Sequence, residues 1–264
     1  MDREGKKTEK PWEKLGGGIK GMRAVKALTL AFCGLSLAAC ATTPPSPDAL
    51  ASNDPYEKTN RDMLDLNGKI DRYIVVPSVA VYFVLVPEAG RRGVHNFLGN
   101  LSLPTIFVND IMQGEFGRGA QSAERFIINT GFGFGGFFDP ARKFGIPAHG
   151  EDFGQTLAVW GVGEGPYLVL PFFGPSNPRD ATGLVVDATM DPTNFIRFKQ
   201  HLWWSGGRLY FTFLDLKGQT YQTIQGIQRS SVDYYTGLRS LYRQLRASDI
   251  RNGRAETKDD LPDF

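Results

Sequence analysis

The residues best suited to proton transfer in this 264-residue chain lie around His149, which is followed closely by Glu151 and Asp152. An imidazole and two carboxylates at this spacing could share general acid–base work. The same spacing is typical of a solvated polar loop, which is the more frequent case. The other histidines, His95 and His201, lie far away in the sequence, and no two histidines have the i, i+4 spacing of a helical metal site. The sequence therefore predicts no metal ion and no other bound cofactor.

Two further motifs could carry chemistry, and each lacks the context that its chemistry needs. The segment Gly131-Phe132-Gly133-Phe134-Gly135-Gly136 has the letters of a GxGxxG dinucleotide fingerprint, but Asp139-Pro140 follows at once and the chain has no repeating β-α-β pattern. Ser176 lies outside any Gly-x-Ser-x-Gly nucleophile elbow. We therefore predict no enzyme activity and interpret the Gly/Phe tract as a flexible apolar loop. Its aromatic side chains would meet lipid or core, and they are Phe132, Phe134, Phe137 and Phe138.

The composition excludes several classes of protein. The chain has 30 Lys and Arg against 28 Asp and Glu, a formal net charge of +2, which excludes a nucleic-acid binder that works by bulk charge. It is 41% hydrophobic, which is too apolar for a disordered chain. The two cysteines, Cys33 and Cys40, both lie near the N-terminus, so neither a disulfide framework nor a four-cysteine zinc site can form.

The N-terminal segment has the layout of a secretory signal. Residues 1–26 are polar and basic, and a run of 13 mostly apolar residues follows from Ala27 to Ala39. A helix of this length spans about 20 Å, less than the roughly 30 Å of a hydrocarbon core, so we expect the run to be cleaved rather than to span a membrane. Translation could also start at Met22. We assign residues 1–39 to the signal peptide.

Cys40 is the predicted membrane anchor. The sequence Leu37-Ala38-Ala39-Cys40, directly after the apolar run, resembles the bacterial lipobox, in which cleavage precedes a cysteine that receives acyl chains. The alternative is a small hydrophobic cysteine in an ordinary signal peptide. Each buried acyl methylene contributes about 0.8 kcal/mol, so a triacylated Cys40 would hold the chain on a bilayer without a transmembrane helix. Ala41, rather than Asp, follows the cysteine, which resembles an outer-membrane sorting signal.

The residues after the anchor divide into a tether, a folded domain and a tail. Residues 40–53 contain several prolines and few large apolar side chains, as in an extended tether. The domain covers residues 54–248, and we expect Asp54 to cap its first helix, with Glu57 placed to complete a capping box. Residues 249–264 are predicted to be a polar, disordered tail.

Hydrophobic periodicity predicts helices and one long, partly irregular stretch. Ile74–Val86 could be a buried strand or an apolar helix that begins near Pro77, and residues 96–103 are rich in turn formers. The stretch from Gly131 to Gly174 is rich in glycine, proline and aromatic residues, which disfavour a helix. Before it, a helix that ends ahead of Gly131 has an apolar face made by Ala120, Ala123, Phe126 and Ile127.

Two more amphipathic helices are predicted in the C-terminal part of the chain. The first covers Asn194–Leu216 and is expected to be kinked or broken at Gly206-Gly207. Within it, Trp203-Trp204 could form an interfacial aromatic belt or pack in a soluble core. Apolar residues from Ile224 to Leu245 mark the last helix.

Ordered blocks of residues between Asp54 and Asn194 resemble the MlaA (VacJ) family of outer-membrane lipoproteins, with a looser helical match to Ser248. The blocks are Asp54-Pro55-Tyr56-Glu57, Asn60-Arg61, Asp71-Arg72-Tyr73, Pro77, Arg91–Leu101, Pro104, Asn109-Asp110, Arg125–Thr130, Glu151–Leu157, Trp160–Tyr167, Leu170–Ser176 and Arg179-Asp180. The likeness is strongest in the blocks from Glu151 onward. Such a series of blocks is far more specific than any single motif.

The resemblance implies a mainly α fold, a ring-like bundle of amphipathic helices that encloses a channel and carries a Gly/Phe-rich irregular hairpin. It implies a location on the periplasmic face of the outer membrane, in the inner leaflet, in association with a trimeric porin. Members of the family remove mislocalised phospholipids from the outer leaflet and pass them to a soluble periplasmic carrier, which maintains lipid asymmetry. No covalent chemistry is involved, and no nucleic acid is a partner.

The resemblance also assigns roles to residues. The gating hairpin would fall on residues 129–161, with hinge glycines at Gly161 and Gly163 and with the phenylalanines of the Gly/Phe tract as its lipid contacts. A Phe-Asn pair linked to leaflet selectivity corresponds to Leu66-Asn67, where Leu replaces Phe. Two alternatives remain, a porin-associated structural lipoprotein without lipid transfer and a lipid hydrolase that uses His149 and its neighbouring carboxylates.

Overall fold

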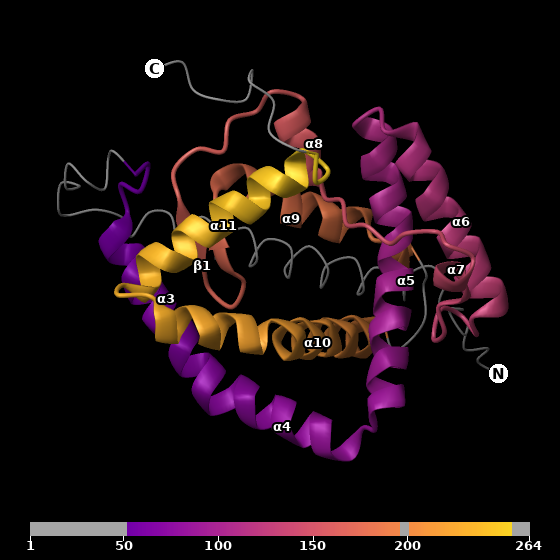
Figure 1. Ribbon diagram of the computed structural model, residues 1–264, viewed down its shortest axis with the longest axis horizontal. Helices are drawn as coiled ribbons and strands as arrows, with labels where there is room; N and C mark the ends of the chain where they lie inside the picture. The colour runs from indigo at the N-terminus through magenta and orange to yellow at the C-terminus, as the bar shows by residue number, and fades with distance from the viewer. Residues whose placement is uncertain (1–51, 196–200, 255–264) are drawn as a thin grey trace, which may run out of the picture. The chain divides into compact units, whose positions relative to one another are not determined.

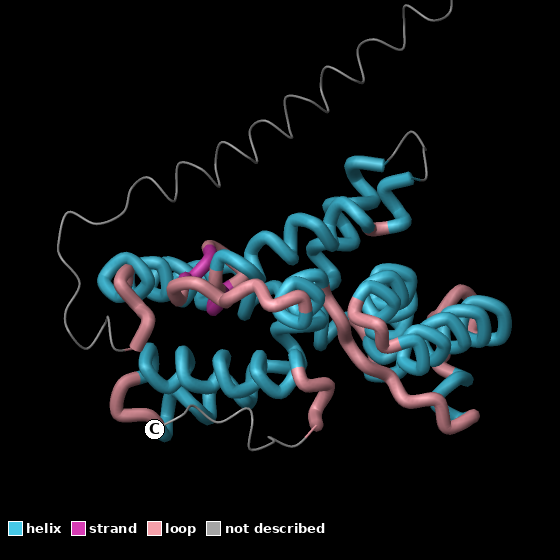
Figure 2. Tube along the Cα trace, turned by 90° about the horizontal axis from the view of Figure 1, so that it is seen from above, coloured by secondary structure: helices cyan, strands magenta, loops and turns pink. Residues whose placement is uncertain are grey.

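The computed structural model describes residues 52–195 and 201–254 (Figure 1). Every residue described below belongs to one unit of the chain, Pro45–Phe264. The predicted signal peptide, Cys40 and nearly all of the tether therefore lie outside the described residues, as do residues 255–264. The described part is mainly helical, which confirms the predicted fold class (Figure 2).

The first helical segment is continuous across three elements. Helix α3 (Glu57–Ile70) passes through the short π-helix η2 (Asp71–Val75) into α4 (Val76–Leu85), which carries a proline in its first turn. Because the segment is continuous, Pro77 removes one N–H from its hydrogen-bond ladder, and the π-helical turn η2 lies directly before this interruption. Of the two alternatives for Ile74–Val86, the helix is therefore the correct one. The chain bends by 118° before the next helix (Figure 1).

Helix α5 (Glu88–Met112) and helix α6 (Phe116–Phe132) lie side by side (Figures 1 and 2). The prediction of a turn-rich segment at 96–103 was wrong, because α5 runs through it without a break. The side chain of Asn100 does not form a local turn but donates to Thr130 Oγ1 at 3.0 Å and to the Gly135 carbonyl at 3.3 Å. Helix α6 also extends past Gly131, where it was expected to end.

The stretch after α6 is only partly irregular, as predicted. It holds two short helices, α7 (Pro140–Lys143) and α8 (Phe153–Val159), and a two-stranded antiparallel sheet in which Val169 pairs with Pro175. The strands are β1 (Leu168–Leu170) and β2 (Gly174–Ser176). Helix α9 (Pro178–Met190) and the 3₁₀-helix η3 (Pro192–Phe195) follow.

Two long helices complete the described chain, with boundaries that differ from the prediction. Helix α10 (His201–Ser230) is unbroken at Gly206-Gly207 and includes Ile224, which was assigned to the last helix. Helix α11 (Tyr234–Ile250) begins where the Asp233 carboxylate accepts the backbone N–H of Tyr235, so this cap separates the two helices. Helix α11 also passes the predicted domain end at residue 248, and Arg254 pairs with Glu115 at 2.7 Å.

A buried carboxylate joins the beginning of the domain to its last helix. Asp54 was expected to cap α3, but α3 has Tyr56 at its N-cap position and no side-chain cap. Instead the Asp54 carboxylate accepts Tyr235 Oη at 2.5 Å, Arg239 Nη1 at 2.6 Å and Asn60 Nδ2 at 2.8 Å. Around it lies a small aromatic core of Tyr167, Val169 and Tyr235, packed against Met63, Leu64 and Tyr242.

Large apolar side chains are common on the surface of the described residues. They include Val84 and Leu85 on α4, Phe132 on α6 and Trp203 on α10. In the described ranges, no helix taken alone combines the length and the apolar character that a membrane span requires. Among the residues that the structure describes, the segments Glu57–Leu85 and Glu88–Met112 are the only pair that meets that requirement together, with the bend between them.

Candidate functional site

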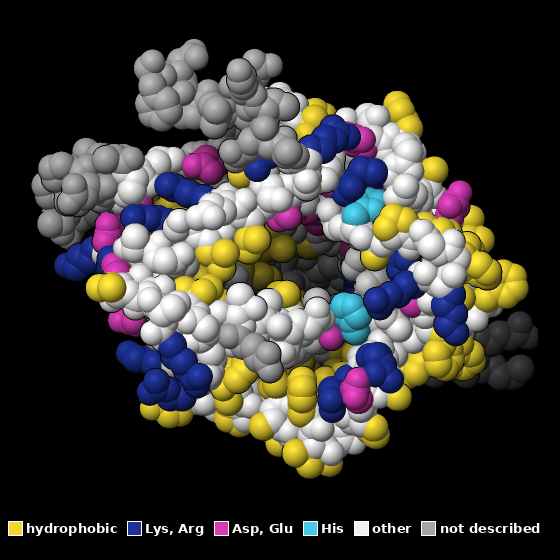
Figure 3. All heavy atoms as spheres, in the orientation of Figure 1, with side chains coloured by type: hydrophobic (Ala, Val, Ile, Leu, Met, Phe, Trp, Pro, Cys, Tyr) yellow, Lys and Arg dark blue, Asp and Glu magenta, His cyan; other side chains and the backbone are white. Residues whose placement is uncertain are grey.

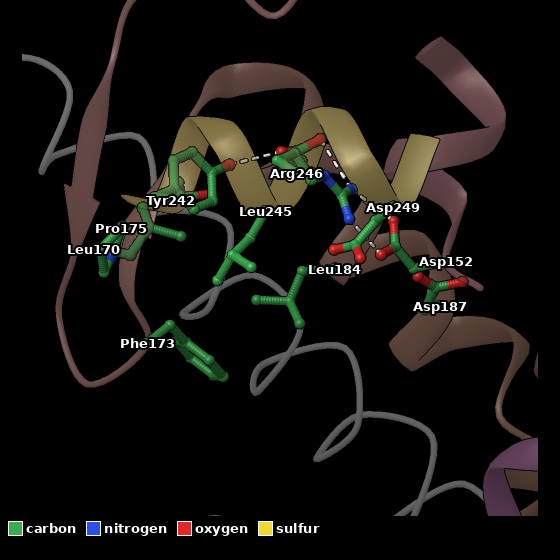
Figure 4. Close-up of a pocket in the computed structure, with 12 residues that line it drawn as sticks. Asp152, Leu170, Phe173, Pro175, Leu184, Asp187, Tyr242, Leu245, Arg246 and Asp249 are labelled. Carbon is green, nitrogen blue, oxygen red and sulfur yellow. Dashed lines mark hydrogen bonds and ion pairs between the residues drawn. The ribbon is translucent and has the colours of Figure 1, made fainter. Parts of the chain in front are cut away.

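A cavity of about 380 Å³ lies where the β1–β2 hairpin, α8, α9 and α11 meet (Figure 4). One part of its wall is apolar and another is charged (Figure 4). The apolar residues are Leu170, Phe173, Pro175, Leu184 and Leu245, and the polar residues are Asp152, Ser176, Asp180, Asp187, Tyr242, Arg246 and Asp249. We call this space the amphipathic cavity. Figure 3 shows hydrophobic side chains along the border of a hollow between α10 and α11.

Arg246 organises the charged part of the wall. Its guanidinium group donates to both oxygens of Asp152 at 2.6 and 2.7 Å, and to both oxygens of Asp180 at 2.8 and 2.9 Å. Tyr242 donates its hydroxyl to Asp180 at 2.5 Å. Charge-assisted bidentate contacts of this kind fix both distance and orientation. The four groups therefore form one rigid, hydrogen-bonded surface on one side of the cavity.

The pKa values of these carboxyl groups diverge according to their partners. Burial acts to raise the pKa of Asp152 and of Asp180, but hydrogen bonds and charge from Arg246 outweigh it and hold both values below the usual range. Burial raises the pKa of Asp187 and of Asp249, which have no such bidentate partner. The polar wall thus contains two firmly ionised carboxylates and two that are easier to protonate.

Short helices and small residues place these groups. Asp152 caps α8 by accepting the Gln155 N–H at 2.9 Å, so the same carboxylate serves the helix and Arg246. Helices α8 and α9 touch through their backbones, because a Cβ atom on Gly183 would lie 2.3 Å from the nitrogen of Gly154. A Cβ atom on Gly154 would lie 2.5 Å from Nη2 of Arg246. The blocks around Glu151–Leu157 and Arg179-Asp180 therefore build the cavity wall.

The structure separates the residues proposed for acid–base work. Nε2 of His149 lies 3.0 Å from Asp110 Oδ2, Glu151 pairs with Arg118 at 2.6 Å, and Asp152 pairs with Arg246. Burial raises the pKa of Glu151, opposed by hydrogen bonds from Gln113 and Arg118. The acid–base alternative required these residues to act together, whereas each is engaged by a different partner. The favoured alternative, a solvated polar loop, does not fit Glu151, which is buried.

His149 does lie in a Ser-His-Asp cluster, but its geometry differs from that of a catalytic triad. Ser122 Oγ lies 3.2 Å from His149 Nε2 and donates to Asp110 at 2.8 Å. A triad needs the serine on one ring nitrogen and the carboxylate on the other, whereas here both face Nε2. Ser122 is also fully buried. The cluster ties α5, α6 and the loop before α8 together. Among residues 52–195 and 201–254, no group of three or more His, Cys, Asp or Glu residues is placed to hold a metal ion.

The phenylalanines of the Gly/Phe tract do not share one environment. Phe132 and Phe134 are 82% and 83% exposed, and Phe138 is also exposed. Phe137 is half-buried against α5, where a Cβ atom on Gly93 would lie 2.1 Å from its Cζ atom. The tract begins in the last two residues of α6 and continues through the helix C-cap and turns rather than a strand-to-helix phosphate loop, so it lacks the geometry that binds a dinucleotide.

The two proposed hinge glycines have different local roles. Gly161 ends α8 in a Schellman motif, in which its N–H bonds to the Ala158 carbonyl and the Val162 N–H bonds to the Leu157 carbonyl, both at 2.9 Å. Its φ angle is +87°, a left-handed conformation that favours glycine. Gly163 has no such angle, and a Cβ atom there would meet no atom within 4 Å.

Asn67 holds the loop of the β1–β2 hairpin, and Leu66 beside it is exposed. The Asn67 amide donates to the Leu170 carbonyl at 2.9 Å and accepts the Phe172 N–H at 2.8 Å. Phe172 has a φ angle of +66°, so these bonds stabilise a strained loop beside Phe173 of the cavity. Sequence reasoning singled out Asn67 but missed Tyr242 and Arg246. The sequence predicted only the apolar face of the last helix, and that pattern carries no information about polar partners on α8 or α9.

The described residues form a mainly helical protein with an amphipathic cavity and exposed apolar side chains, a combination typical of proteins that handle lipids. A solved structure described as the structural basis for maintenance of bacterial outer membrane lipid asymmetry matches with a TM-score of 0.66 and 32% sequence identity. The match covers 75% of this chain and 98% of that chain. The family model of the MlaA lipoprotein matches residues 52–249. The chain belongs to the MlaA lipoprotein family, which confirms the resemblance.

Relatives from several bacteria support this assignment. The intermembrane phospholipid transport system lipoprotein MlaA of Escherichia coli strain K12 is 34% identical over 82% of this chain and 85% of its own length. The protein of the same name from Haemophilus influenzae is 31% identical over 92% of this chain and 97% of its own length. An uncharacterized protein from Rickettsia bellii is 33% identical over 75% of this chain and 77% of its own length.

Proposed function

We propose that this protein removes mislocalised phospholipids from the outer leaflet of the outer membrane and passes them toward a periplasmic carrier, without covalent chemistry. The observation that carries the proposal is the amphipathic cavity in a member of a family whose relatives are named for phospholipid transport. Its apolar and charged walls match the two ends of a phospholipid.

The physical reason concerns the headgroup. A charged or polar group moved into hydrocarbon without hydrogen-bonding partners loses several kcal/mol. The Arg246 network offers polar partners on one side of the cavity, while Leu184 and Leu245 offer apolar contact on the other (Figure 4). A lipid that passes along these walls can keep its headgroup hydrated and its acyl chains in apolar contact.

The exposed apolar residues fit a protein seated in one leaflet. Acyl chains on Cys40 would supply the anchor. The exposed side chains of α4, of the Gly/Phe tract and of α10 would then lie in hydrocarbon or at its border, and they include Val84, Leu85, Phe132, Phe134 and Trp203. The outer membrane, on its periplasmic face, is the location we assign.

The same proposal includes a gate and two protein partners. The hairpin over residues 129–161 would control entry, with hinges at Gly161 and Gly163, and Leu66-Asn67 would set leaflet selectivity. A trimeric porin would position the protein, and a soluble carrier would receive the lipid. The family resemblance supports these assignments, and the separate environments of the two glycines make the gate testable.

A deletion strain of the source bacterium tests the proposal. Aminophospholipid at the cell surface is labelled on intact cells with a membrane-impermeant amine reagent. We expect the deletion to raise the label and the unaltered gene to restore it. Leu245→Asn should restore it poorly because it places an amide on the apolar wall of the cavity. Leu216→Asn is the matched control, since both leucines are 55% exposed and only Leu245 lines the cavity.

Three outcomes would count against the proposal. Unchanged surface label in the deletion strain would favour a structural lipoprotein that binds porins without moving lipid. Equal rescue by the two leucine variants would show that transport does not depend on the apolar wall of the amphipathic cavity. Lysophospholipid or fatty acid released by the purified protein would favour the hydrolase, against which the shared Nε2 contact of the His149 cluster argues.

A further inference from the structure

A second cavity, of about 260 Å³, lies where the end of α4 and the start of α5 meet α10. It is separate from the amphipathic cavity, because the two share no lining residue. Figure 3 shows positively and negatively charged side chains gathered over the junction of α5 and α10. The residues that line the second cavity are Tyr82, Phe83, Glu88, Arg91, Arg92, His95, Asp215, Gly218 and Gln219.

Tyr82 supplies a buried hydroxyl that the protein leaves unpaired. The residue is only 7% exposed, and its Oη atom has no hydrogen-bond partner among the described residues. A buried polar group without a partner costs about 1–3 kcal/mol, so native proteins rarely keep one without a use. At neutral pH a phenol is protonated and can donate. The hydroxyl is therefore a donor that the described residues do not use, on a side chain that lines the cavity.

Two arginines add positive charge to the same wall. Arg91 donates through Nη1 to the carbonyls of Val86 and Phe83, at 2.8 and 3.1 Å, and its guanidinium stacks 4.2 Å from the centre of the Phe83 ring. Within the described ranges it has no carboxylate at ion-pair distance. Arg92 pairs with Glu88, and both side chains are largely exposed. An anion in the cavity would thus meet the Arg91 guanidinium, one neutral donor, and an Arg92 guanidinium that it shares with Glu88, which also lines the cavity.

Helix α10 contributes a carboxylate to the same cavity. Asp215 Oδ2 accepts Gln219 Nε2 at 2.8 Å and lies 2.8 Å from His95 Nδ1. Both contacts use Oδ2, and the side chain of Asp215 is mostly buried. A carboxylate that lines the same cavity as two guanidinium groups disfavours a ligand that is purely anionic and favours one that has a positive group beside its negative group.

We propose that the second cavity binds the zwitterionic headgroup of a phospholipid. The phosphate lies against Arg91, Arg92 and the Tyr82 hydroxyl, and the ammonium group faces Asp215. The cavity is smaller than the roughly 300–1,000 Å³ of sites that enclose a whole small molecule, which suits a headgroup without its acyl chains. The exposed apolar residues Val84 and Leu85 at the end of α4 lie beside it and offer a place for the chains.

Gly218 makes the junction possible. A Cβ atom there would lie 3.1 Å from the Phe83 ring, so a glycine lets α10 approach the end of α4 closely. The site extends the proposed function, because it rests on phospholipid as the substrate and names the headgroup that is recognised at the bend between α4 and α5. Binding itself can be measured without any transport assay.

The experiment uses the purified full-length lipoprotein in detergent and short-chain lipids that stay dispersed. Titration calorimetry compares dihexanoyl phosphatidylethanolamine, dihexanoyl phosphatidylglycerol and inorganic phosphate. We expect the ethanolamine lipid to bind most tightly. Tyr82→Phe should weaken it about fivefold to tenfold, the loss expected for one hydrogen bond. Tyr73→Phe is the matched control, because Tyr73 is 73% exposed and lies outside the cavity. Asp215→Asn should remove the preference over the glycerol lipid.

Two results would overturn the site, and neither depends on transport. The first is equal affinity in the Tyr82→Phe and Tyr73→Phe variants. The second is inorganic phosphate binding as tightly as the ethanolamine lipid, because the cavity would then hold a bare anion. The two proposals can fail separately. If the purified protein binds the lipids as expected but deletion of the gene leaves surface phospholipid unchanged, the proposed transport is refuted and the headgroup site is retained.

Discussion

Replacing the two proposed hinge glycines by alanine should change stability in opposite directions. At Gly161 the φ angle of +87° forces alanine into the left-handed region, which costs about 1–2 kcal/mol. Alanine also restricts the unfolded chain, which returns about 0.4–1 kcal/mol. The net expectation for Gly161→Ala is a loss of about 1 kcal/mol in the free energy of unfolding. At Gly163 only the second effect operates, because no left-handed angle and no neighbouring atom opposes the methyl group. Gly163→Ala should therefore raise the free energy of unfolding slightly.

Urea unfolding of the detergent-solubilised protein, followed by circular dichroism, measures both changes. The surface-phospholipid label in cells then shows whether Gly161 only caps α8 or whether Gly161 and Gly163 both act as hinges of a gate. If Gly161 only ends α8, transport should fall in proportion to the folded fraction, and Gly163→Ala should transport normally. If both glycines bend during transport, both variants should transport poorly although one of them is more stable than the parent. Equal destabilisation of the two variants would refute the reasoning from backbone angles.

Three further expectations follow from the contacts around the amphipathic cavity. The pKa of Asp152 is lowered in the folded state, so ionised Asp152 stabilises the fold above the ordinary pKa of about 3.8, and this stabilisation is lost as the pH falls below that value. Arg246→Met should therefore weaken the dependence of the free energy of unfolding on pH in the acid range, measured by urea unfolding at a series of pH values. An unchanged pH dependence would contradict the role of Arg246. Gly183→Ala should destabilise by about 1–3 kcal/mol because its Cβ atom meets backbone, whereas Gly206→Ala, with no neighbour within 4 Å, should stabilise α10 by up to about 1 kcal/mol in the same unfolding assay. Asn67→Ala should lower the free energy of unfolding by about 1–3 kcal/mol and speed hydrogen exchange at the amides of the hairpin loop, because the variant loses both hydrogen bonds to that loop. Exchange rates equal to those of the parent would show that the loop conformation does not depend on Asn67.

The sequence was sufficient for the family and for the mainly helical class, because both depend on patterns local to short blocks. It failed where a side chain has a distant partner. Asp54 has the residue type and neighbours of a helix cap, yet its carboxylate bonds to Tyr235, 181 positions away. Asn100 belongs to a group of turn formers, yet it lies inside a continuous helix, because its amide binds the chain after α6. A local pattern cannot distinguish these uses from the local ones.

The cavity illustrates the same limit. Leu245 belongs to the apolar face that periodicity predicts for the last helix, whereas no local pattern marks Arg246 beside it. Its role depends on Asp152 and Asp180, which lie 94 and 66 positions away in the sequence. The glycines are instructive in another way, since Gly206 and Gly207 resemble a helix break and yet lie within α10. Packing of a long amphipathic helix outweighs the roughly 1 kcal/mol that each glycine costs.

The contact of Asp54 with Tyr235 and Arg239 places a constraint on the order of assembly. The first turn of the domain is held by a helix whose Tyr235 leaves the ribosome 181 residues after Asp54. Until that helix arrives, the Asp54 carboxylate has no guanidinium partner, and the cavity lacks the wall that holds Tyr242 and Arg246. The Asp54 contacts and the cavity wall therefore form late in folding, because they join residues far apart in the sequence. A chain truncated ahead of Tyr234 would lack these contacts, and its N-terminal half would be exposed to quality-control proteases.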